Sequence, residues 1–165
     1  ADALTIKQHF GSFDSVHLTY IGDGNNVCQS LMEIAIACGF SMSVVSPSAY
    51  APTDYPEGIE IVEDISSVIS KTNVIYTDVW VSMGDEHEKD DRLSAFKDYQ
   101  VTTDLMKQAK SDAIFLHCLP AHIGKEVSEA VFESDQSKVF DQAEHRMYAQ
   151  NGVMAWLMER GKNEK

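Results

Sequence analysis

The chain has 165 residues, of which 44% are hydrophobic and 24% charged, and its formal net charge is −13. This length suits one domain with a single core, and the acidic balance argues against a nucleic-acid partner, because a phosphate backbone requires basic side chains. No apolar run is long enough to cross a bilayer, no signal peptide opens the sequence, and the three cysteines form no C-x-x-C pair. We therefore expect a cytoplasmic protein with no membrane partner, no disulfide framework and no structural zinc site.

Strand-like apolar runs alternate with helical stretches along the chain. In the first half we expect strands at 16–23, 43–47 and 58–62, and a helix from about Asn25 to Cys38 that Gly39 ends. This helix should bury Cys28 and Cys38 as small hydrophobic residues. In the second half we expect strands at 73–80, 99–102 and 112–120, a charged helix at 86–99, a short last strand at 138–142 and a closing helix from about Ala143 to Arg160.

The predicted strands are continuous apolar runs rich in valine, isoleucine and aromatic residues. This pattern is typical of parallel strands buried on both faces, and the alternation with helices predicts βαβ crossovers. We expect an α/β fold, a three-layer, doubly wound, mainly parallel and Rossmann-like sheet that forms a single domain. Ligands of such sheets bind beyond the carboxyl ends of the strands, so polar residues at these ends are candidates for a site.

The first candidate is the turn "YIGDGNN" at residues 20–26. It lacks the third glycine of a dinucleotide-binding G-x-G-x-x-G motif, because Val27 occupies that position. Asn25 or Asn26 could cap the following helix. Asn26 could also offer its amide beside the positive end of the helix dipole, where a substrate carboxylate would bind. The cap and the ligand contact are equally consistent with the sequence.

The second candidate is "TDVWVSMGDE" at residues 77–86. Asp78 ends an apolar strand, where an unpaired buried carboxylate would be costly, so we expect it to be exposed in a crevice and to bind a cationic ligand. Ser82, Met83 and Gly84 form a short loop that can present a hydroxyl group and backbone N–H groups. The acidic run at 85–91 indicates a solvated helix start and not a metal site.

The third candidate is "HCLP" at residues 117–120. Cys118 ends a predicted strand that Pro120 stops, and it is either a small buried hydrophobic residue or a thiol aimed at the crevice. His117 could influence a thiolate, but neighbouring strand residues point to opposite faces, which disfavours a direct Cys–His dyad. A metal held by His117, His122 and His145 is a weaker alternative, since no supporting carboxylate or thiol spacing accompanies them.

These stretches together resemble one family. "DVWVSMG" and "HCLP", with "GDGNN" upstream and "FDQAEHR" downstream, are similar to ornithine carbamoyltransferase, specifically to its C-terminal, ornithine-binding half. The resemblance covers essentially the whole chain, and the S-M-G loop after D-x-W is the ornithine-type signature. It implies a transferase that moves the carbamoyl group of carbamoyl phosphate to the δ-amine of L-ornithine, giving L-citrulline and phosphate. It places the enzyme in arginine biosynthesis or the arginine deiminase route, and implies no cofactor and no metal.

The resemblance also implies roles for individual residues. The residues implied to bind the amino-acid end of L-ornithine are Asn26, Asp78, Ser82 and Met83. Cys118 and Leu119 would lie at the reacting end, and Arg146 would hydrogen-bond carbamoyl phosphate. Cys118, Asp78 and Arg146 are thus the expected catalytic residues. Asp78 and Cys118 could favour the neutral δ-amine or accept its proton.

Two departures from the family pattern are visible. The family commonly has A-E-N-R where this chain has "AEHR", so His145 replaces an asparagine beside the retained Arg146. The carbamoyl-phosphate half, with its Ser-Thr-Arg-Thr loop and His-Pro-x-Gln segment, is absent from the sequence. Three scattered arginines do not supply the convergent cations that a phosphate dianion needs. We therefore expect the chain alone to bind carbamoyl phosphate poorly and to be inactive.

The resemblance leaves the oligomeric state open. The full-length family is homotrimeric largely through the absent half, and the closing helix returns to that half, so we expect an exposed apolar face on this helix and self-association through it. Two other function classes remain. One is a non-catalytic amino-acid-binding or regulatory module that keeps the ornithine pocket. The other is a nucleotide-binding domain that uses "GDGNN", which the missing third glycine disfavours.

Overall fold

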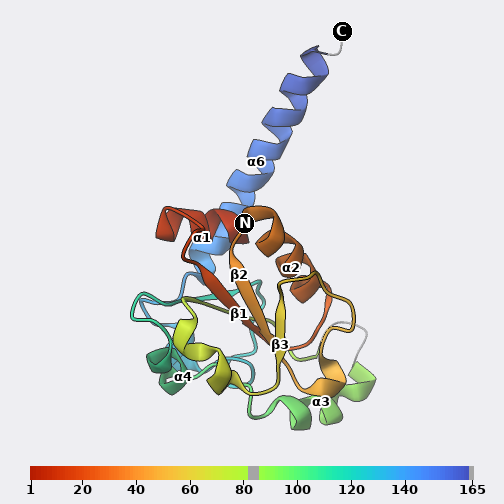
Figure 1. Cartoon of the computed structure of the whole chain (residues 1–165), viewed down its shortest axis with the longest axis vertical. Helices are drawn as coiled ribbons and strands as arrows, with labels where there is room; N and C mark the ends of the chain where they lie inside the picture. The colour runs from red at the N-terminus through yellow and green to blue at the C-terminus, as the bar shows by residue number, and fades with distance from the viewer. Residues whose placement is uncertain (82–85, 164–165) are drawn as a thin grey trace.

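The computed structural model of the protein describes residues 1–81 and 86–163 (Figure 1). Within these residues, five short strands form the central sheet: β1 (His17–Ile21), β2 (Ser41–Val45), β3 (Glu60–Val62), β4 (Val74–Thr77) and β5 (Ile114–His117). All neighbouring pairs are parallel, and the order is β3-β2-β1-β4-β5. The predicted doubly wound, Rossmann-like α/β fold is confirmed. The strand order reverses between β1 and β4, so a crevice is expected at their carboxyl ends.

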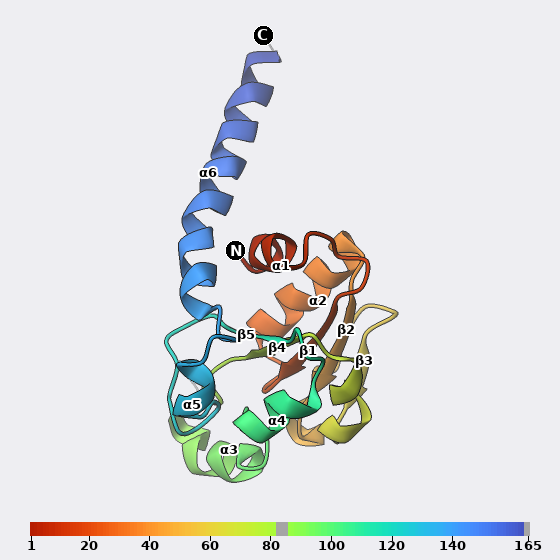
Figure 2. The same cartoon turned by 90° about the vertical axis from the view of Figure 1, so that its left-hand side faces the viewer.

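Helices cover both faces of the sheet (Figure 2). One face carries α1 (Asp2–Phe10) and α2 (Asn26–Cys38), and the other carries α4 (Thr103–Gln108) and α5 (Glu129–Phe132). Side chains of β4 alternate between two cores: Tyr76 packs in the α2 core with Leu31, and Ile75 packs in the other with Met106. The strands are buried on both faces, as their continuous apolar runs predict.

The remaining helical segments lie in the connections. Short 3-10 turns occur at η1 (Ser48–Tyr50), η2 (Ile65–Ser67) and η3 (Ile69–Lys71), and η4 (Glu86–Glu88) precedes α3 (Lys89–Phe96). The acidic run is a helix start, as expected, and Asp90 and Asp91 are exposed in the first turn of α3.

Helix α2 begins and ends at the residues that its sequence signals. Asn25 is the N-cap, and its side-chain Oδ1 accepts hydrogen bonds from the backbone N–H groups of Val27 and Cys28. Gly39 ends the helix with a left-handed φ of 77°. Cys28 is buried as expected, whereas Cys38 is only partly buried because it lies in the last turn.

The strand predicted at 99–102 is wrong. Val101 pairs with the segment around Val127 through an isolated parallel bridge, which does not extend into a ladder. Thr102 then caps α4, because its side-chain oxygen accepts a hydrogen bond from the N–H of Leu105. A cap of this kind starts a helix directly after the bridge and prevents further strand pairing.

The strand predicted at 138–142 is also wrong, because this segment begins helix α6 (Val139–Asn163). Backbone pairing with β5 stops at the isolated bridge between Ser137 and Phe115. The N–H of Gln142 already donates to the carbonyl of Lys138, as in the first turn of a helix. The predicted closing helix therefore exists but starts four residues earlier than expected.

Helix α6 projects away from the rest of the domain (Figures 1 and 2). Its outer part exposes large apolar side chains, as expected from the sequence: Met147, Val153, Met154, Trp156, Leu157 and Met158. None of the helices in the described part of the chain is both long and apolar enough to cross a membrane.

Candidate functional site

A pocket of about 260 Å³ opens at the carboxyl end of β5 and between the starts of α1, α2 and α6. Several of the predicted site residues line it or touch its lining. The lining includes Asp2, Asn26, Tyr76, Cys118, Gln142 and Arg146. Residues that are far apart in sequence meet here because parallel strands end at the same edge of the sheet.

Asp78 follows β4 directly and is buried, with 7% of its surface exposed. The expectation that it would be exposed is wrong, and three hydrogen-bond donors explain why burial is tolerated. Oδ1 accepts from the N–H of Val79 at 2.7 Å and from the thiol of Cys118 at 2.9 Å. Oδ2 accepts from Nδ2 of Asn25 at 2.9 Å. These three bonds fix the carboxylate in place. One of its donors, Cys118, lines the pocket.

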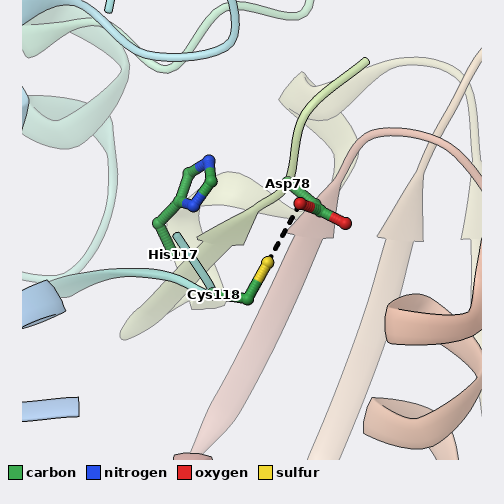
Figure 3. Close-up of side chains that lie close together, drawn as sticks. All are labelled: Asp78, His117 and Cys118. Atoms are coloured by element: carbon green, nitrogen blue, oxygen red, sulfur yellow. Dashed lines mark hydrogen bonds between the residues drawn. The ribbon is translucent and has the colours of Figure 1, made fainter. Parts of the chain in front are cut away.

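Cys118 is exposed, which excludes the alternative of a small buried hydrophobic residue. Figure 3 shows its sulfur pointing toward Asp78. Partial burial of the thiol, followed by the hydrogen bond and the negative charge of Asp78, raises the pKa of Cys118 well above its ordinary value. Cys118 is therefore a neutral thiol near pH 7 and not a thiolate nucleophile.

His117 is buried and bonds to a different carboxylate from Cys118. Its Nδ1 accepts from the N–H of Leu119 at 2.9 Å, which assigns the ring proton to Nε2, 3.3 Å from Oε1 of Glu126. The ring lies apart from the Cys118–Asp78 bond (Figure 3). A Cys–His dyad is accordingly not formed, as the alternation of strand side chains predicts. No pattern in the sequence identifies Glu126 as this partner.

The three histidines considered as metal ligands do not form such a site in the described part of the chain. The group there with suitable ligand atoms is instead Asp78, His117 and Cys118, whose atoms lie within 4.8 Å of one another. Both ring nitrogens of His117 already have hydrogen-bond partners. A metal ion would have to displace one of these partners, so the arrangement fits a hydrogen-bonded pocket better than a metal centre.

Leu119 has a left-handed φ of 52° and is the one non-glycine residue with positive φ in the described ranges. Such a conformation is uncommon for a leucine and clusters at ligand sites. The hydrogen bond from its N–H to His117 holds this turn. The residue implied to lie at the reacting end is thus held in a specific backbone geometry.

The two asparagines of "GDGNN" have separate roles. Asn25 caps α2 and also donates to Asp78, which joins the ends of β1 and β4. Asn26 is not the cap; it is exposed and lines the pocket at the start of α2. The sequence could not separate these roles, because adjacent asparagines match the capping pattern equally well.

Of the three arginines, Arg146 is the one that lines the pocket. Arg92 is buried and pairs with Asp23 at 2.7 Å and Glu88 at 3.2 Å. Arg160 stacks on Trp156 within α6. Among the described residues that line this pocket, Arg146 is therefore the one arginine or lysine, so a phosphate dianion would find no cluster of cations here. The predicted contacts Ser82 and Met83 lie outside the described residues.

A larger pocket of about 550 Å³ lies beside α4. Its lining includes Glu63, Asp64, Tyr99 and Asp104 and none of the predicted site residues. The smaller pocket is the better candidate, because it brings together the thiol that follows β5, the amide of Asn26 at the start of α2 and the guanidinium of Arg146 on α6.

Comparisons with known proteins point to one family. The family model "Aspartate/ornithine carbamoyltransferase, Asp/Orn binding domain" matches residues 14–157. An ornithine carbamoyltransferase of Methanosphaera stadtmanae is 43% identical over 166 residues, with 93% of this chain and 55% of the relative covered. The corresponding protein of Archaeoglobus fulgidus is 42% identical over 166 residues, with 96% and 54% covered.

Solved structures show the same likeness. Ornithine carbamoyltransferase from Pyrococcus furiosus superposes with a TM-score of 0.85 at 40% identity, covering 93% of this chain and 53% of that one. The enzyme from Thermus thermophilus gives a TM-score of 0.81 at 34% identity, with 93% and 52% covered. The chain spans about half the length of the curated relatives it matches.

Proposed function

Because the chain belongs to the aspartate/ornithine carbamoyltransferase family, we propose that residues 1–165 form the ornithine-binding domain of an ornithine carbamoyltransferase. The complete enzyme would transfer the carbamoyl group of carbamoyl phosphate to the δ-amine of L-ornithine and release L-citrulline and phosphate. The chain spans about half the length of its relatives, so the other half would supply most carbamoyl-phosphate contacts and the contacts between subunits.

The observation that carries this proposal is the Cys118–Asp78 pair at the ends of β5 and β4. L-Ornithine is a zwitterion with a second ammonium group, so its pocket needs a negative charge that is not neutralised by a protein cation. Asp78 receives hydrogen bonds from neutral donors, namely Asn25, Val79 and Cys118. Its full charge therefore remains available to attract an ammonium group that enters above Cys118.

The same pocket offers partners for the other charges of the substrates. Asn26 lines it at the start of α2, where the helix dipole favours the α-carboxylate of ornithine. Arg146 lines the same pocket from α6 and would hydrogen-bond carbamoyl phosphate. Ser82 and Met83 would complete the amino-acid end, and Leu119 would lie beside Cys118 at the reacting end.

The reaction requires a neutral δ-amine. The δ-ammonium group first loses a proton, and Asp78 is the acceptor, either directly or through the Cys118 thiol that already donates to it. The amine lone pair then forms the new N–C bond at the carbonyl carbon of carbamoyl phosphate. The bond from that carbon to the phosphate oxygen breaks, phosphate leaves with the electron pair, and the departing phosphate takes up the second proton of the nitrogen. Cys118 remains a thiol throughout, in agreement with its raised pKa.

The charge of the pocket favours ornithine over aspartate as the acceptor. An aspartate substrate brings a second carboxylate, which the buried Asp78 would repel. An ornithine substrate brings an ammonium group to the same place.

The free state of all three cysteines also suits a reducing compartment, which supports a cytoplasmic location for the enzyme.

Calorimetry on the chain tests the proposal. We expect L-ornithine to bind, L-aspartate and NAD not to bind, and Asp78→Asn to weaken ornithine binding by about tenfold or more through loss of a charge-assisted hydrogen bond. Asp112→Asn is the matched control, because Asp112 is exposed and lies outside the pocket lining. Equal ornithine affinity in the chain and in Asp78→Asn would refute the assignment. Tight binding of NAD would favour the nucleotide-binding alternative.

A further inference from the structure

The first turns of α6 are tied to helix α1 by two side-chain hydrogen bonds. Nε2 of Gln142 donates to Oδ1 of Asp2 at 2.8 Å. One turn further along, Nδ1 of His145 lies 2.8 Å from Oγ1 of Thr5. Both bonds span 140 positions in the sequence, so they fix how α6 is rotated against α1.

The donor in the second bond follows from the partners of Thr5. Its hydroxyl group has one hydrogen, which it donates to the carbonyl of Ala1 at 3.1 Å. The oxygen is then left as an acceptor, so Nδ1–H of His145 donates to it. Thr5 is buried, with 3% of its surface exposed, so water does not compete for this bond.

His145 is the last residue of α6, within the described part of the chain, whose side chain hydrogen-bonds to another element. Further along the helix, Tyr148 bonds to Glu144 and Arg160 stacks on Trp156, both inside α6. Met147 and the apolar residues beyond it are exposed. The rotation of the helix at position 146 is therefore set by the contacts that end at position 145.

Arg146 follows this last contact and lines the pocket together with Gln142 and Ala143. Ala1 and Asp2 line the same pocket, so α1 and α6 form one wall of it. Arg146 is exposed, and its guanidinium group makes no side-chain hydrogen bond or ion pair with the described residues. Its position depends on the backbone from which it projects.

We propose that His145 is a positioning residue for Arg146, acting through its hydrogen bond to Thr5. This inference rests on the proposed function, in which Arg146 binds carbamoyl phosphate. It also accounts for the departure from the A-E-N-R pattern. Nδ1 of histidine and Nδ2 of asparagine are both bonded to Cγ, so each can place an N–H at the same point along the side chain. The histidine therefore retains the contact that an asparagine would make to Thr5.

The test uses a catalytically complete enzyme that carries this chain. We expect His145→Ala to raise the KM for carbamoyl phosphate by about five- to tenfold, the loss expected when one binding contact is misaligned, with the KM for ornithine unchanged. His145→Asn should restore the original value, because its Nδ2–H replaces Nδ1–H. Thr5→Val should reproduce the effect of His145→Ala while keeping the shape of the side chain, and Thr5→Ser should not.

The double variant His145→Ala with Thr5→Val should be no worse than either single variant, because both remove the same bond. His9→Ala is the control, since His9 lies on α1 but is exposed. Should His145→Ala fold poorly, Thr5→Val and Thr5→Ser give the same test on their own.

Arg146→Ala separates the two levels of the proposal. If it leaves the KM for carbamoyl phosphate unchanged, the proposed role of Arg146 fails. If it raises that KM while His145→Ala and Thr5→Val do not, the positioning role of His145 is overturned and the proposed function stands. An equal loss in the His145→Ala and His145→Asn variants would likewise overturn it, because the hydrogen bond would then be irrelevant.

Discussion

The thiol of Cys118 donates a hydrogen bond to Oδ1 of Asp78 at 2.9 Å, although the two residues lie 40 positions apart in the sequence. The bond joins the ends of two adjacent parallel strands and fixes the direction of the sulfur (Figure 3). The neighbouring carboxylate also disfavours the thiolate form of Cys118. This pair is accordingly the most direct place to test the chemistry of the pocket.

The reactivity of Cys118 should be low for an exposed cysteine. Since burial of its thiol and the Asp78 carboxylate raise its pKa, we expect slow alkylation by iodoacetamide at pH 7–8 and a rate that still rises well above that pH. Asp78→Asn removes the negative charge, so it should lower the pKa and speed alkylation. Mass spectrometry of the labelled peptide measures the rate, with the partly buried Cys38 as internal reference. An unchanged rate in Asp78→Asn would show that the carboxylate does not control the thiol.

Replacing Cys118 tests its role in transfer. In a complete enzyme we expect Cys118→Ser to lower kcat/KM for ornithine by about tenfold or more, because the shorter C–O bond withdraws the donor from Asp78 and alters the surface beside the amine. Cys118→Ala should be worse, since it removes the donor entirely. Cys38→Ser serves as control. Full ornithine affinity and turnover in Cys118→Ser would contradict the assignment of this residue to the reacting end.

Asn25 should contribute to stability in two separable ways. Asn25→Ser keeps a capping oxygen but loses the donor to Asp78, whereas Asn25→Ala loses both. We expect Asn25→Ala to lower the free energy of unfolding by at least about 1 kcal/mol, with a smaller loss for Asn25→Ser. Urea unfolding measures both. Equal losses in the two variants would mean that the cap adds nothing to the bond with Asp78.

His17 should make the protein less stable in mild acid. Burial, followed by repulsion from Lys71, lowers the pKa of His17 from 6.5 to about 4. The unfolded chain therefore takes up a proton as the pH falls through 6.5, whereas the folded chain does not until about pH 4. Stability should decrease across this window as the pH falls and should be fully retained above it.

Urea unfolding at several pH values measures this contribution. We expect His17→Gln to flatten the dependence between pH 6.5 and 4, because glutamine keeps an N–H for Ser43 and does not titrate. His9→Gln, which changes an exposed histidine, should leave the dependence as it is. A slope that survives in His17→Gln would assign the effect to other groups.

The exposed face of α6 should make the isolated chain associate. Val153, Met154 and Leu157 lie on one side of the helix and are each more than half exposed. We expect light scattering to show concentration-dependent association and a hydrophobic dye to bind. Met154→Lys with Leu157→Lys should reduce both, whereas Glu159→Lys on the other side should not. A monomer that binds no dye would contradict this expectation.

The sequence by itself determined the fold class and the edge of the sheet at which the site lies. Continuous apolar runs that alternate with helical stretches are a local pattern, and they specify parallel strands buried on both faces. The residues that end these runs, Asp78 and Cys118, could be named because strand ends in such sheets carry the ligand site. The helix from Asn25 to Cys38 was likewise marked by its own cap and stop signals.

The local sequence pattern predicted the wrong secondary structure where strand pairing depends on partners far along the chain. Residues 99–102 and 138–142 have strand-like composition, but neither segment forms a ladder. Val101 forms only an isolated bridge before Thr102 caps α4, and α6 begins at Val139 directly after the isolated bridge of Ser137. Residues 103–108 and 129–132 form helices too short for their periodicity to be recognised.

Only the tertiary structure decided the state of the site residues. The burial of Asp78 is tolerated because Asn25 and Cys118 arrive from other strand ends, and no sequence spacing predicts that three donors will meet one carboxylate. The contact of His145 with Thr5 crosses 140 positions in the same way. Hydrophobic periodicity is a property of neighbouring residues, whereas the partners of a polar side chain are set by how the packed elements are brought together.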